Sequence, residues 1–253
     1  MKKWRAKEIE SLLFEHRDDA QRDHMMRFFK TGKGQYGEGD RFLGLKVPQT
    51  REIVKRLKLS VDSEEIERLL YSQWHEVRLC GLLLLAEEMK ANLPKRRDSE
   101  DMLNTKENRR RELAVFYLKH ARQANNWDLV DLSCELVLGV YIRLSKERDY
   151  DILCKLACSE NLWEQRIAIV TTLEFIRNGI FLPTLKISEM LLNHPHDLIH
   201  KAIGWVLREI GKRDRGVLIE FLDNNFNRMP RTSLRYAIEH FTPEERQYWL
   251  NRR

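Results

Sequence analysis

The chain has 253 residues, of which 42% are hydrophobic, and its 45 lysine and arginine residues against 39 acidic residues give a formal net charge of +6. Such a chain can bury a large core, and its small positive excess would favour a polyanion only if the charge gathers on one face. No stretch approaches the roughly 18 uncharged residues of a membrane span, and Cys80, Cys134, Cys154 and Cys158 form no Cys-x-x-Cys pair, so we expect a soluble cytoplasmic protein with buried, reduced thiols.

Residues that interrupt helices mark the expected elements in chain order. Glycines crowd Thr31–Asp40, which predicts a mobile loop, but the segment lacks the Gly-Lys-Ser/Thr ending and the preceding strand of a nucleotide-binding loop. Pro48 predicts a helix that begins near Gln49. The charged segment Lys95–Asn108 has no apolar period and predicts a surface connection. Further helix boundaries are expected at Pro183 and Pro243.

Five stretches begin with a charged residue and continue as an apolar run. The charged residues are separated by 53, 35, 35 and 30 positions, which is the spacing of two-helix repeats with one longer connection. We therefore expect an all-α fold, an α-solenoid of about six helix pairs that forms one domain over residues 1–253. The charged residues are Arg78, Asp131, Arg166, Lys201 and Arg231.

Apolar residues within these runs recur at helical period, three or four positions apart. No segment alternates as a strand would, so the apolar positions should form the core between helices. They are Leu79, Leu82, Leu83 and Ala86; Leu113, Phe116 and Tyr117; Ile169, Thr172, Leu173 and Ile176; and Ile203, Val206, Leu207 and Ile210.

One of the five charges is reversed, because Asp131 stands among four cations. A row of cations on the concave face of stacked helices suits a polyanion, and a carboxylate there weakens binding unless it takes part in chemistry. Trp127 lies four residues before Asp131 and so shares its helix face, and an indole beside a carboxylate can stabilise a cation. The alternative is that Trp127 packs in the core and Asp131 caps a helix or pairs with an arginine.

Two further tryptophans precede an arginine by about one turn. Trp163 precedes Arg166 and is expected in the core, whereas Trp205 precedes Arg208 and shares the helix face of Lys201. Cations bind phosphates and indole rings pack on sugars and bases, so this pattern is typical of a nucleic-acid surface.

Other charged segments are less informative. The clusters Lys95–Arg97, Arg109–Arg111 and Lys212–Arg215 fit either an electrostatic footprint on a polyanion or ordinary solvated surface. The histidines of Asn193–His200 match no ligand spacing of a known metal site, so we expect no bound metal.

Four motifs resemble the AlkD-type DNA alkylation-repair family, DNA glycosylases built of HEAT-like repeats. The most specific are Asn126-Trp-Asp-Leu-Val-Asp131, Ser159-Glu-Asn-Leu-Trp-Glu-Gln-Arg166 and Lys201-Ala-Ile-Gly-Trp-Val-Leu-Arg-Glu209, and a weaker one is Phe42-Leu-Gly-Leu-Lys-Val-Pro48. They occur in the family's order and span nearly the whole chain.

The resemblance implies roles for individual residues. Asp131 would be the catalytic carboxylate, Trp127 and Trp205 would form an aromatic cleft around the sugar of the lesion, and Arg166 would contribute to the active site and hold DNA. Phe28 stands where the family has a tyrosine that faces the active site, so the ring is kept and the hydroxyl lost. Further DNA contacts are expected from Phe28, Lys46, Arg51, Lys201 and Arg208.

The expected function is therefore base-excision repair. The substrate would be cationic alkylpurines, N7-methylguanine and N3-methyladenine, in double-stranded DNA, hydrolysed at the N-glycosidic bond without a cofactor by a monomer associated with the nucleoid. Two alternatives stay open: a DNA-structure binder of the same family without catalysis, and a helical-repeat scaffold that binds proteins, because fold alone does not establish function.

Overall fold

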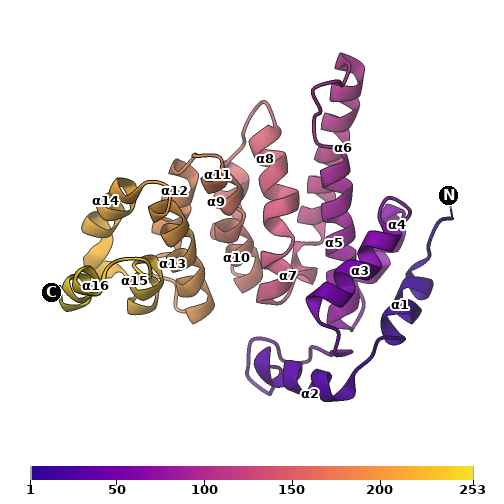
Figure 1. Cartoon of the computed structure of the whole chain (residues 1–253), viewed down its shortest axis with the longest axis horizontal. Helices are drawn as coiled ribbons and strands as arrows, with labels where there is room; N and C mark the ends of the chain where they lie inside the picture. Colours follow the sequence, from indigo (N-terminus) through magenta and orange to yellow (C-terminus); the bar gives the residue numbers. More distant parts are fainter. Residues whose placement is uncertain (1, 253) are drawn as a thin grey trace. The chain divides into compact units, whose positions relative to one another are not determined.

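A computed structural model describes residues 2–252, and the regular structure in this range is helical apart from one isolated bridge between Arg41 and Trp74 (Figure 1). The all-α class of stacked helical repeats predicted from the sequence is confirmed. The chain divides into two compact units, the first ending at Val137 and the second beginning at Leu138. A single domain and a concave basic face stay predictions.

The first unit is organised around one buried helix, α5 (His75–Ala91). Its leucine run, Leu82–Leu85, is buried on every side, since α5 packs against α1, α3, α4, α6 and α7. Such a helix has no polar face and needs neighbours all round. The other elements are α1 (Ala6–Phe14), α2 (Asp19–Phe28), α3 (Val47–Leu57), α4 (Ser63–Leu70), α6 (Glu100–Lys119), a 3-10 turn η1 (Ala121–Gln123) and α7 (Trp127–Asp131).

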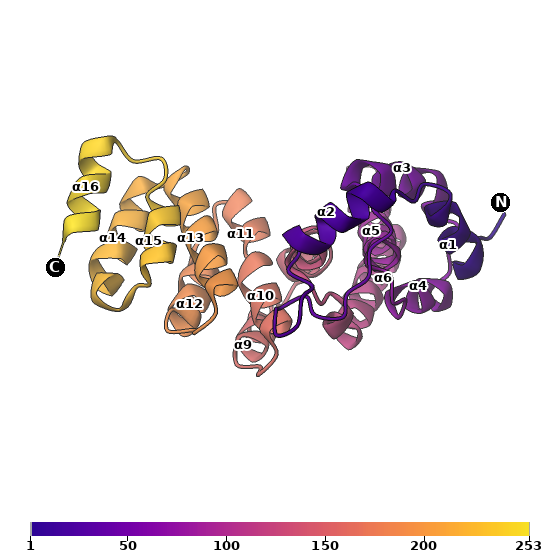
Figure 2. The ribbon, with the colours of Figure 1, turned by 90° about the horizontal axis from the view of Figure 1, so that it is seen from below.

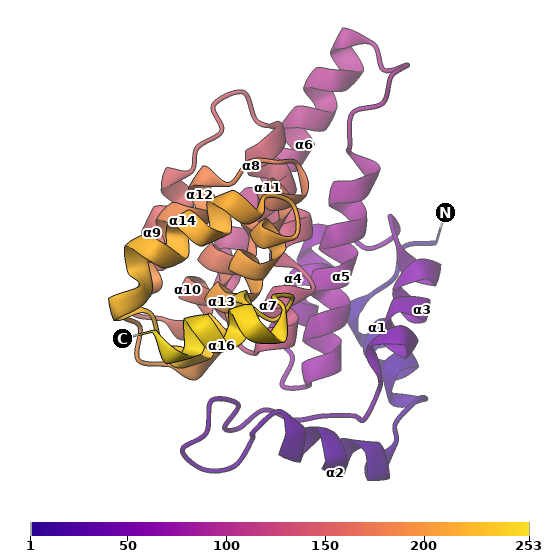
Figure 3. The same ribbon diagram turned by 60° about the vertical axis from the view of Figure 1, so that its left-hand side comes forward.

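Side-chain caps explain where helices of this unit begin. The Gln49 side chain accepts a hydrogen bond from the backbone N–H of Lys46 at 2.8 Å, so α3 begins at Val47, two residues before the predicted start, with Pro48 in its first turn. Ser99 caps α6, and the predicted surface connection Lys95–Asn108 is helical from Glu100 onward, which corrects the sequence-based expectation. Figure 3 shows α6 continuing past the C-terminal end of α5.

The second unit is centred on α13 (Asp197–Gly211), which packs against α10, α12, α14 and α15. Figure 2 shows α13, α14 and α15 side by side. A π-helical stretch, Glu135–Gly139, runs across the boundary between the units along the chain. The other elements are α8 (Val140–Leu144), α9 (Asp151–Ala157), α10 (Leu162–Val170), α11 (Leu173–Arg177), α12 (Leu182–Leu191), α14 (Arg215–Asn225), a 3-10 turn η3 (Phe226–Arg228), α15 (Arg231–Ala237) and α16 (Pro243–Asn251).

A glycine sets the distance between α13 and α15. A Cβ atom on Gly204 would lie 2.4 Å from the Cβ of Tyr236 and 2.5 Å from the carbonyl oxygen of Ser233. Both contacts are too short for a real Cβ, and the second is to rigid backbone. Gly204 therefore allows the close approach of two helices that hold the centre of the second unit together.

The predicted core is confirmed with few exceptions. All the periodic apolar positions are buried except Phe116, which is half-buried. Trp163 is buried, as expected. Cys80 and Cys134 are buried, but Cys154 is half-buried and Cys158, at the C-terminal end of α9, is exposed, which corrects the expectation of four buried thiols.

We expect Gly204→Ala to destabilise the second unit, because its methyl group has to displace the α15 backbone. Overpacking of this kind costs roughly 1–3 kcal/mol, more than the gain of about 1 kcal/mol in helix propensity. The matched control is Gly216→Ala in α14, where the new Cβ meets nothing closer than 3.3 Å. Urea unfolding should show a loss for the first variant and none for the second; equal midpoints would contradict this account of the packing.

Candidate active site

The short helix α7 brings Trp127 and Asp131 to one cavity of about 480 Å³ in the first unit. Asn126 caps the helix, its side-chain oxygen accepting the N–H of Trp127 at 2.9 Å. One helical turn then separates the indole from the carboxylate, so both face the same way, as their spacing predicts. The cavity is also lined by Gln21, His24, Met25, Phe28, Phe29, Lys46, Val47, Pro48, Asp128 and Leu132.

The wall beside Trp127 is aromatic. Phe29 stacks on the indole with ring centroids 5.2 Å apart and an interplanar angle of 20°, and Phe28 meets it edge-on at 5.9 Å and 72°. Phe42 stacks on the other side of Phe29 at 5.0 Å. Phe28 itself is 57% exposed, so its ring is available to a ligand while Phe29 and Phe42 are buried behind it.

Charge in this cavity is sparse and placed near its edge. Asp131 is half-buried, and Lys46 is exposed where α3 begins, immediately after the Phe42–Leu45 segment. The other lining carboxylate, Asp128, is 4% exposed and turned into the protein. Asp131 is therefore the carboxylate of this cavity that a bound molecule can reach.

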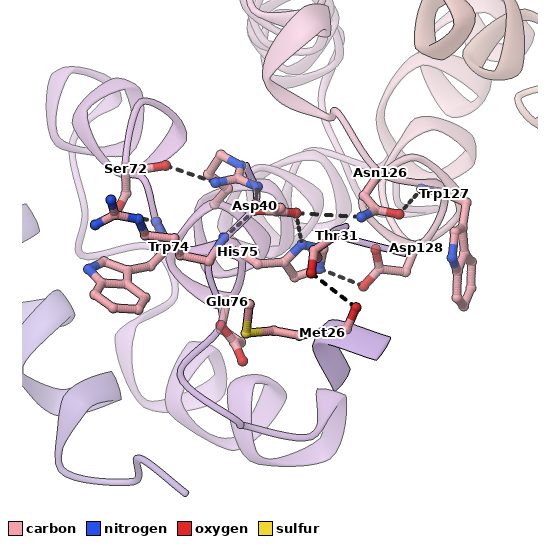
Figure 4. A network of polar contacts seen from close by, with 12 residues as sticks. Met26, Thr31, Asp40, Ser72, Trp74, His75, Glu76, Asn126, Trp127 and Asp128 are labelled. Atoms are coloured by element: carbon pink, nitrogen blue, oxygen red, sulfur yellow. Dashed lines mark hydrogen bonds and ion pairs between the residues drawn. The ribbon is translucent and has the colours of Figure 1, made fainter. Parts of the chain in front are cut away.

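Directly behind α7 lies a buried ionic network of four side chains (Figure 4). The imidazole of His75 donates from Nδ1 to Asp40 at 2.8 Å and from Nε2 to Asp128 at 2.9 Å, and Arg78 donates to the second oxygen of Asp40 at 2.6 Å. All four residues are at most 8% exposed. Burial opposes a charged imidazole, but Asp128 and Asp40 outweigh it and raise the pKa of His75 to about 9.

The neighbouring Glu76 holds the segment that leads to Lys46. Its buried carboxylate accepts the backbone N–H groups of Leu43, Gly44 and Leu45 at 2.8–3.1 Å. Gly44 has a φ of +96°, and a Cβ there would lie 2.0 Å from the carbonyl oxygen of Asp18. Only glycine fits this turn, and the turn sets where Lys46 stands at the cavity.

The glycine-rich loop is confirmed as a loop, and both its ends are tied down. Thr31 donates its hydroxyl to the carbonyl of Met26 at 3.1 Å, and Asp40 belongs to the buried ionic network. Nothing in the linear sequence links Asp40, His75 and Asp128, which are 35 and 53 positions apart. One local signal could have indicated that Asp128 is buried: it stands between Trp127 and the apolar residues Leu129 and Val130.

The remaining predicted site residues lie outside this cavity. Arg51 is exposed on α3. In the second unit, Arg166 is 5% exposed and donates to the Leu198 carbonyl at 2.6 Å. Lys201, Trp205 and Arg208 are half-buried on α13, where Lys201 pairs with Asp197 at 2.7 Å and Arg208 pairs with Glu239.

The expected row of equivalent cations needs correction. Arg78 is 4% exposed and donates hydrogen bonds to Asp40 and to the Ser72 carbonyl. Its charge therefore balances a buried carboxylate and does not face solvent. The five charged residues also do not all open helices: Arg231 begins α15, Arg166 lies mid-helix, and Asp131 is the last residue of α7. The repeat spacing thus indicated where helices occur, but the five charged residues do not occupy equivalent positions in those helices.

The histidine cluster makes turn contacts. His194 bonds the Gln165 side chain at 2.8 Å, and His196 accepts the N–H of Leu198 as the cap of α13. Among residues 2–252, no group of three or more histidine, cysteine, aspartate or glutamate side chains could hold a metal ion.

Within the same range, no helix combines the length and apolar character that crossing a bilayer requires.

Comparison with known proteins gives a consistent picture. The sequence model of the family described as DNA alkylation repair enzyme matches residues 9–241. A solved structure described as a predicted DNA alkylation repair enzyme from Enterococcus faecalis superposes with a TM-score of 0.67 at 17% identity, covering 90% of this chain and 97% of that one. At this identity the structural match bears on the fold. No match was found among curated protein sequences.

The raised pKa of His75 predicts a pH-dependent stability. The network stabilises the fold fully below the ordinary pKa of 6.5, and this stabilisation is lost as pH rises through about 9. The stability difference between the wild type and His75→Gln should therefore shrink by about 3 kcal/mol between about pH 6 and about pH 9.5.

Urea unfolding at both pH values measures the difference. His120→Gln is the matched control, since burial lowers the pKa of this second buried histidine and its difference should not shrink. A His75→Gln difference that is independent of pH would show that the buried imidazole is neutral.

Proposed function

The chain belongs to the DNA alkylation repair enzyme family, and from this premise we propose that it is a monofunctional DNA glycosylase. Its substrates are cationic alkylpurines in duplex DNA, such as N7-methylguanine and N3-methyladenine, and it hydrolyses their N-glycosidic bond. The observation that carries the proposal is the cavity in which the half-buried Asp131 carboxylate stands one turn from Trp127, against an aromatic wall.

A single reachable carboxylate fits this chemistry. A purine alkylated at N3 or N7 is already positively charged, so it leaves with the electron pair of the C1′–N bond and becomes neutral without a general acid. The sugar acquires oxocarbenium character as the bond breaks. The Asp131 carboxylate stabilises that charge and accepts the proton of the water that adds to C1′. The pair of carboxyl groups that most sugar hydrolases use is unnecessary.

The size of the electrostatic effect selects the substrate. Two unit charges about 4 Å apart, at an effective dielectric of about 20, interact by about 4 kcal/mol. This lowers a barrier enough for about a thousandfold acceleration. That suffices for a base that is already a good leaving group and falls far short for an unmodified one.

The aromatic residues of the cavity suit the same transition state. The faces of Trp127 and Phe28 are electron-rich, and an aromatic face attracts a cation within about 6 Å. Phe28 and Trp127 meet in a T-shaped contact, which needs no hydroxyl, so phenylalanine in place of the family tyrosine preserves the packing. A polar contact from that position is absent from the proposed mechanism.

Residues of the second unit also have roles in this proposal. Trp205 packs on the sugar of the lesion, and Arg166, Lys201 and Arg208 contact the phosphates. The half-buried positions of Trp205, Lys201 and Arg208 on one helix support this role. Lys46 and Arg51, both exposed on the first unit, bind phosphates next to the cavity. The reaction needs water alone, so the proposed enzyme works without a cofactor, and we propose that it acts as a monomer on DNA at the nucleoid.

Asp131→Asn is expected to abolish most excision of 7-methylguanine from methylated duplex DNA, by about a thousandfold in the single-turnover rate. DNA affinity should be unchanged or better, since the substitution removes a negative charge facing a polyanion. Asp101→Asn, an exposed aspartate in the first turn of α6, is the control and should behave as wild type. Excision by Asp131→Asn at the wild-type rate would refute the assignment, and DNA binding without excision by the wild type would favour a non-catalytic binder.

Lys46→Ala is expected to weaken DNA binding and to reduce the slope of log K against log salt by about 0.9, the value for one phosphate contact on duplex DNA. The matched control is Lys90→Ala, a lysine exposed at the C-terminal end of α5 and away from the cavity. Titrations at several salt concentrations give both slopes. Equal slopes for the two variants would remove Lys46 from the DNA-binding surface.

A further inference from the structure

We propose that His75 is a positioning residue for catalysis, which holds α7 through Asp128 in the orientation that presents Asp131 and Trp127 to the substrate. The inference rests on the proposed glycosylase function, because it assigns Asp131 the reacting role. His75 itself touches neither the cavity nor a bound molecule, since it is fully buried behind α7.

The helix α7 is short, with five residues, and a turn at Leu132 and Ser133 separates it from the π-helical stretch Glu135–Gly139 and α8. A segment of little more than one turn gains little stability from its own hydrogen bonds. Side chains that anchor α7 to its neighbours therefore contribute to its direction. Trp127 and Asp131 face the cavity, which leaves Asp128, Leu129 and Val130 as the buried anchors.

Asp128 makes the shorter of two polar contacts that tie this helix to the network, because the buried cap Asn126 donates from Nδ2 to Asp40 at 3.4 Å. Leu129 and Val130 are buried apolar residues whose packing is not directional. Asp128 Oδ2 accepts a hydrogen bond from His75 Nε2 at 2.9 Å, and its Oδ1 has no hydrogen-bond partner among the described residues. This bond thus links α7 directly to the first residue of α5.

His75 is itself fixed from every side. It is the first residue of the buried helix α5, its Nδ1 donates to Asp40, and Arg78 holds Asp40 from the opposite side. Its ring stacks on Phe42, with centroids 4.3 Å apart, and packs against Phe29 at 5.2 Å.

The same histidine also reaches Trp127 by a second route. Phe29 packs against the imidazole and also stacks on the indole. The position of His75 is therefore transmitted to the indole through rings and to the Asp131 helix through Asp128. A reacting carboxylate displaced by about 1 Å can lose about a hundredfold in rate, so such a link matters for catalysis even where it adds little to binding.

A conservative substitution separates positioning from catalysis. In Asp128→Asn the amide can donate to His75 Nε2 while Nδ1–H still donates to Asp40, so the link survives with the imidazole neutral. In Asp128→Ala the link is lost. We expect Asp128→Ala to lower the single-turnover excision rate by about tenfold to a hundredfold with DNA affinity unchanged, and Asp128→Asn to stay within about threefold of wild type.

A spectroscopic measurement tests the geometry without any activity. Protein labelled with 5-fluorotryptophan gives one ¹⁹F resonance for each of the six tryptophans, and Trp127→Phe identifies that of Trp127. The Trp127 resonance should shift or broaden in Asp128→Ala and keep its position in Asp128→Asn. The control is Asp98→Ala, which removes a buried carboxylate paired with Lys106 at 2.6 Å and should leave both the resonance and the excision rate unchanged.

The outcomes separate this inference from the proposed function. If the wild type excises nothing, the glycosylase assignment fails, while the ¹⁹F result still decides whether Asp128 orients Trp127. If Asp128→Asn loses excision as completely as Asp131→Asn, Asp128 acts as the chemical carboxylate and the positioning role is wrong. An unmoved Trp127 resonance in Asp128→Ala also overturns it. Should Asp128→Ala fail to fold, the comparison of the two asparagine variants carries the test.

Discussion

The cavity wall depends on the His75 imidazole, which is held between two buried carboxylates. An isolated ion buried in protein costs several kcal/mol, and the cost is offset only where partners are close and well oriented. Here His75 faces Asp40 and Asp128 at hydrogen-bond distance, and Arg78 balances the second negative charge. Since the network joins the glycine-rich loop, α5 and α7, the geometry that keeps these charges paired is the geometry that forms one wall of the cavity.

In this arrangement the long helix α5 provides the support, and the short helix α7 carries residues that line the cavity. The helix α5 is buried from His75 to Ala86, and its first two residues, His75 and Glu76, fix α7 and the turn before Lys46 respectively. Both segments that line the cavity are therefore held by adjacent residues in the first turn of α5. In the proposed mechanism this preorganisation keeps the Asp131 carboxylate where positive charge develops on the sugar, so that no rearrangement is needed during the reaction.

The local sequence pattern was enough to predict most helices and the common face of Trp127 and Asp131, which both line the cavity. Apolar residues three and four apart gave the core, and the four-residue spacing of Trp127 and Asp131 gave their common face, since both follow from helix geometry alone. The anchors of α7 could not be predicted, because their partners are distant in sequence and a buried aspartate looks the same as a solvated one. Arg78 was wrongly assigned to the row of DNA-facing cations for the same reason. Its spacing fitted the repeat pattern, but its partner Asp40, distant in sequence, holds it inside the protein. Capping by Ser99 was a local signal, and it was overlooked within a highly charged segment.

In the proposed mechanism Asp131 stabilises positive charge on the sugar, and the affinity for an analogue of that charged state measures this directly. Duplex DNA carrying a cationic pyrrolidine in place of one deoxyribose should bind the wild-type protein at least about tenfold more tightly than DNA carrying the neutral tetrahydrofuran, which corresponds to about 1.4 kcal/mol. In Asp131→Asn the preference should disappear. Equal affinities of the wild type for the two DNAs, or a preference that survives in the variant, would contradict the account.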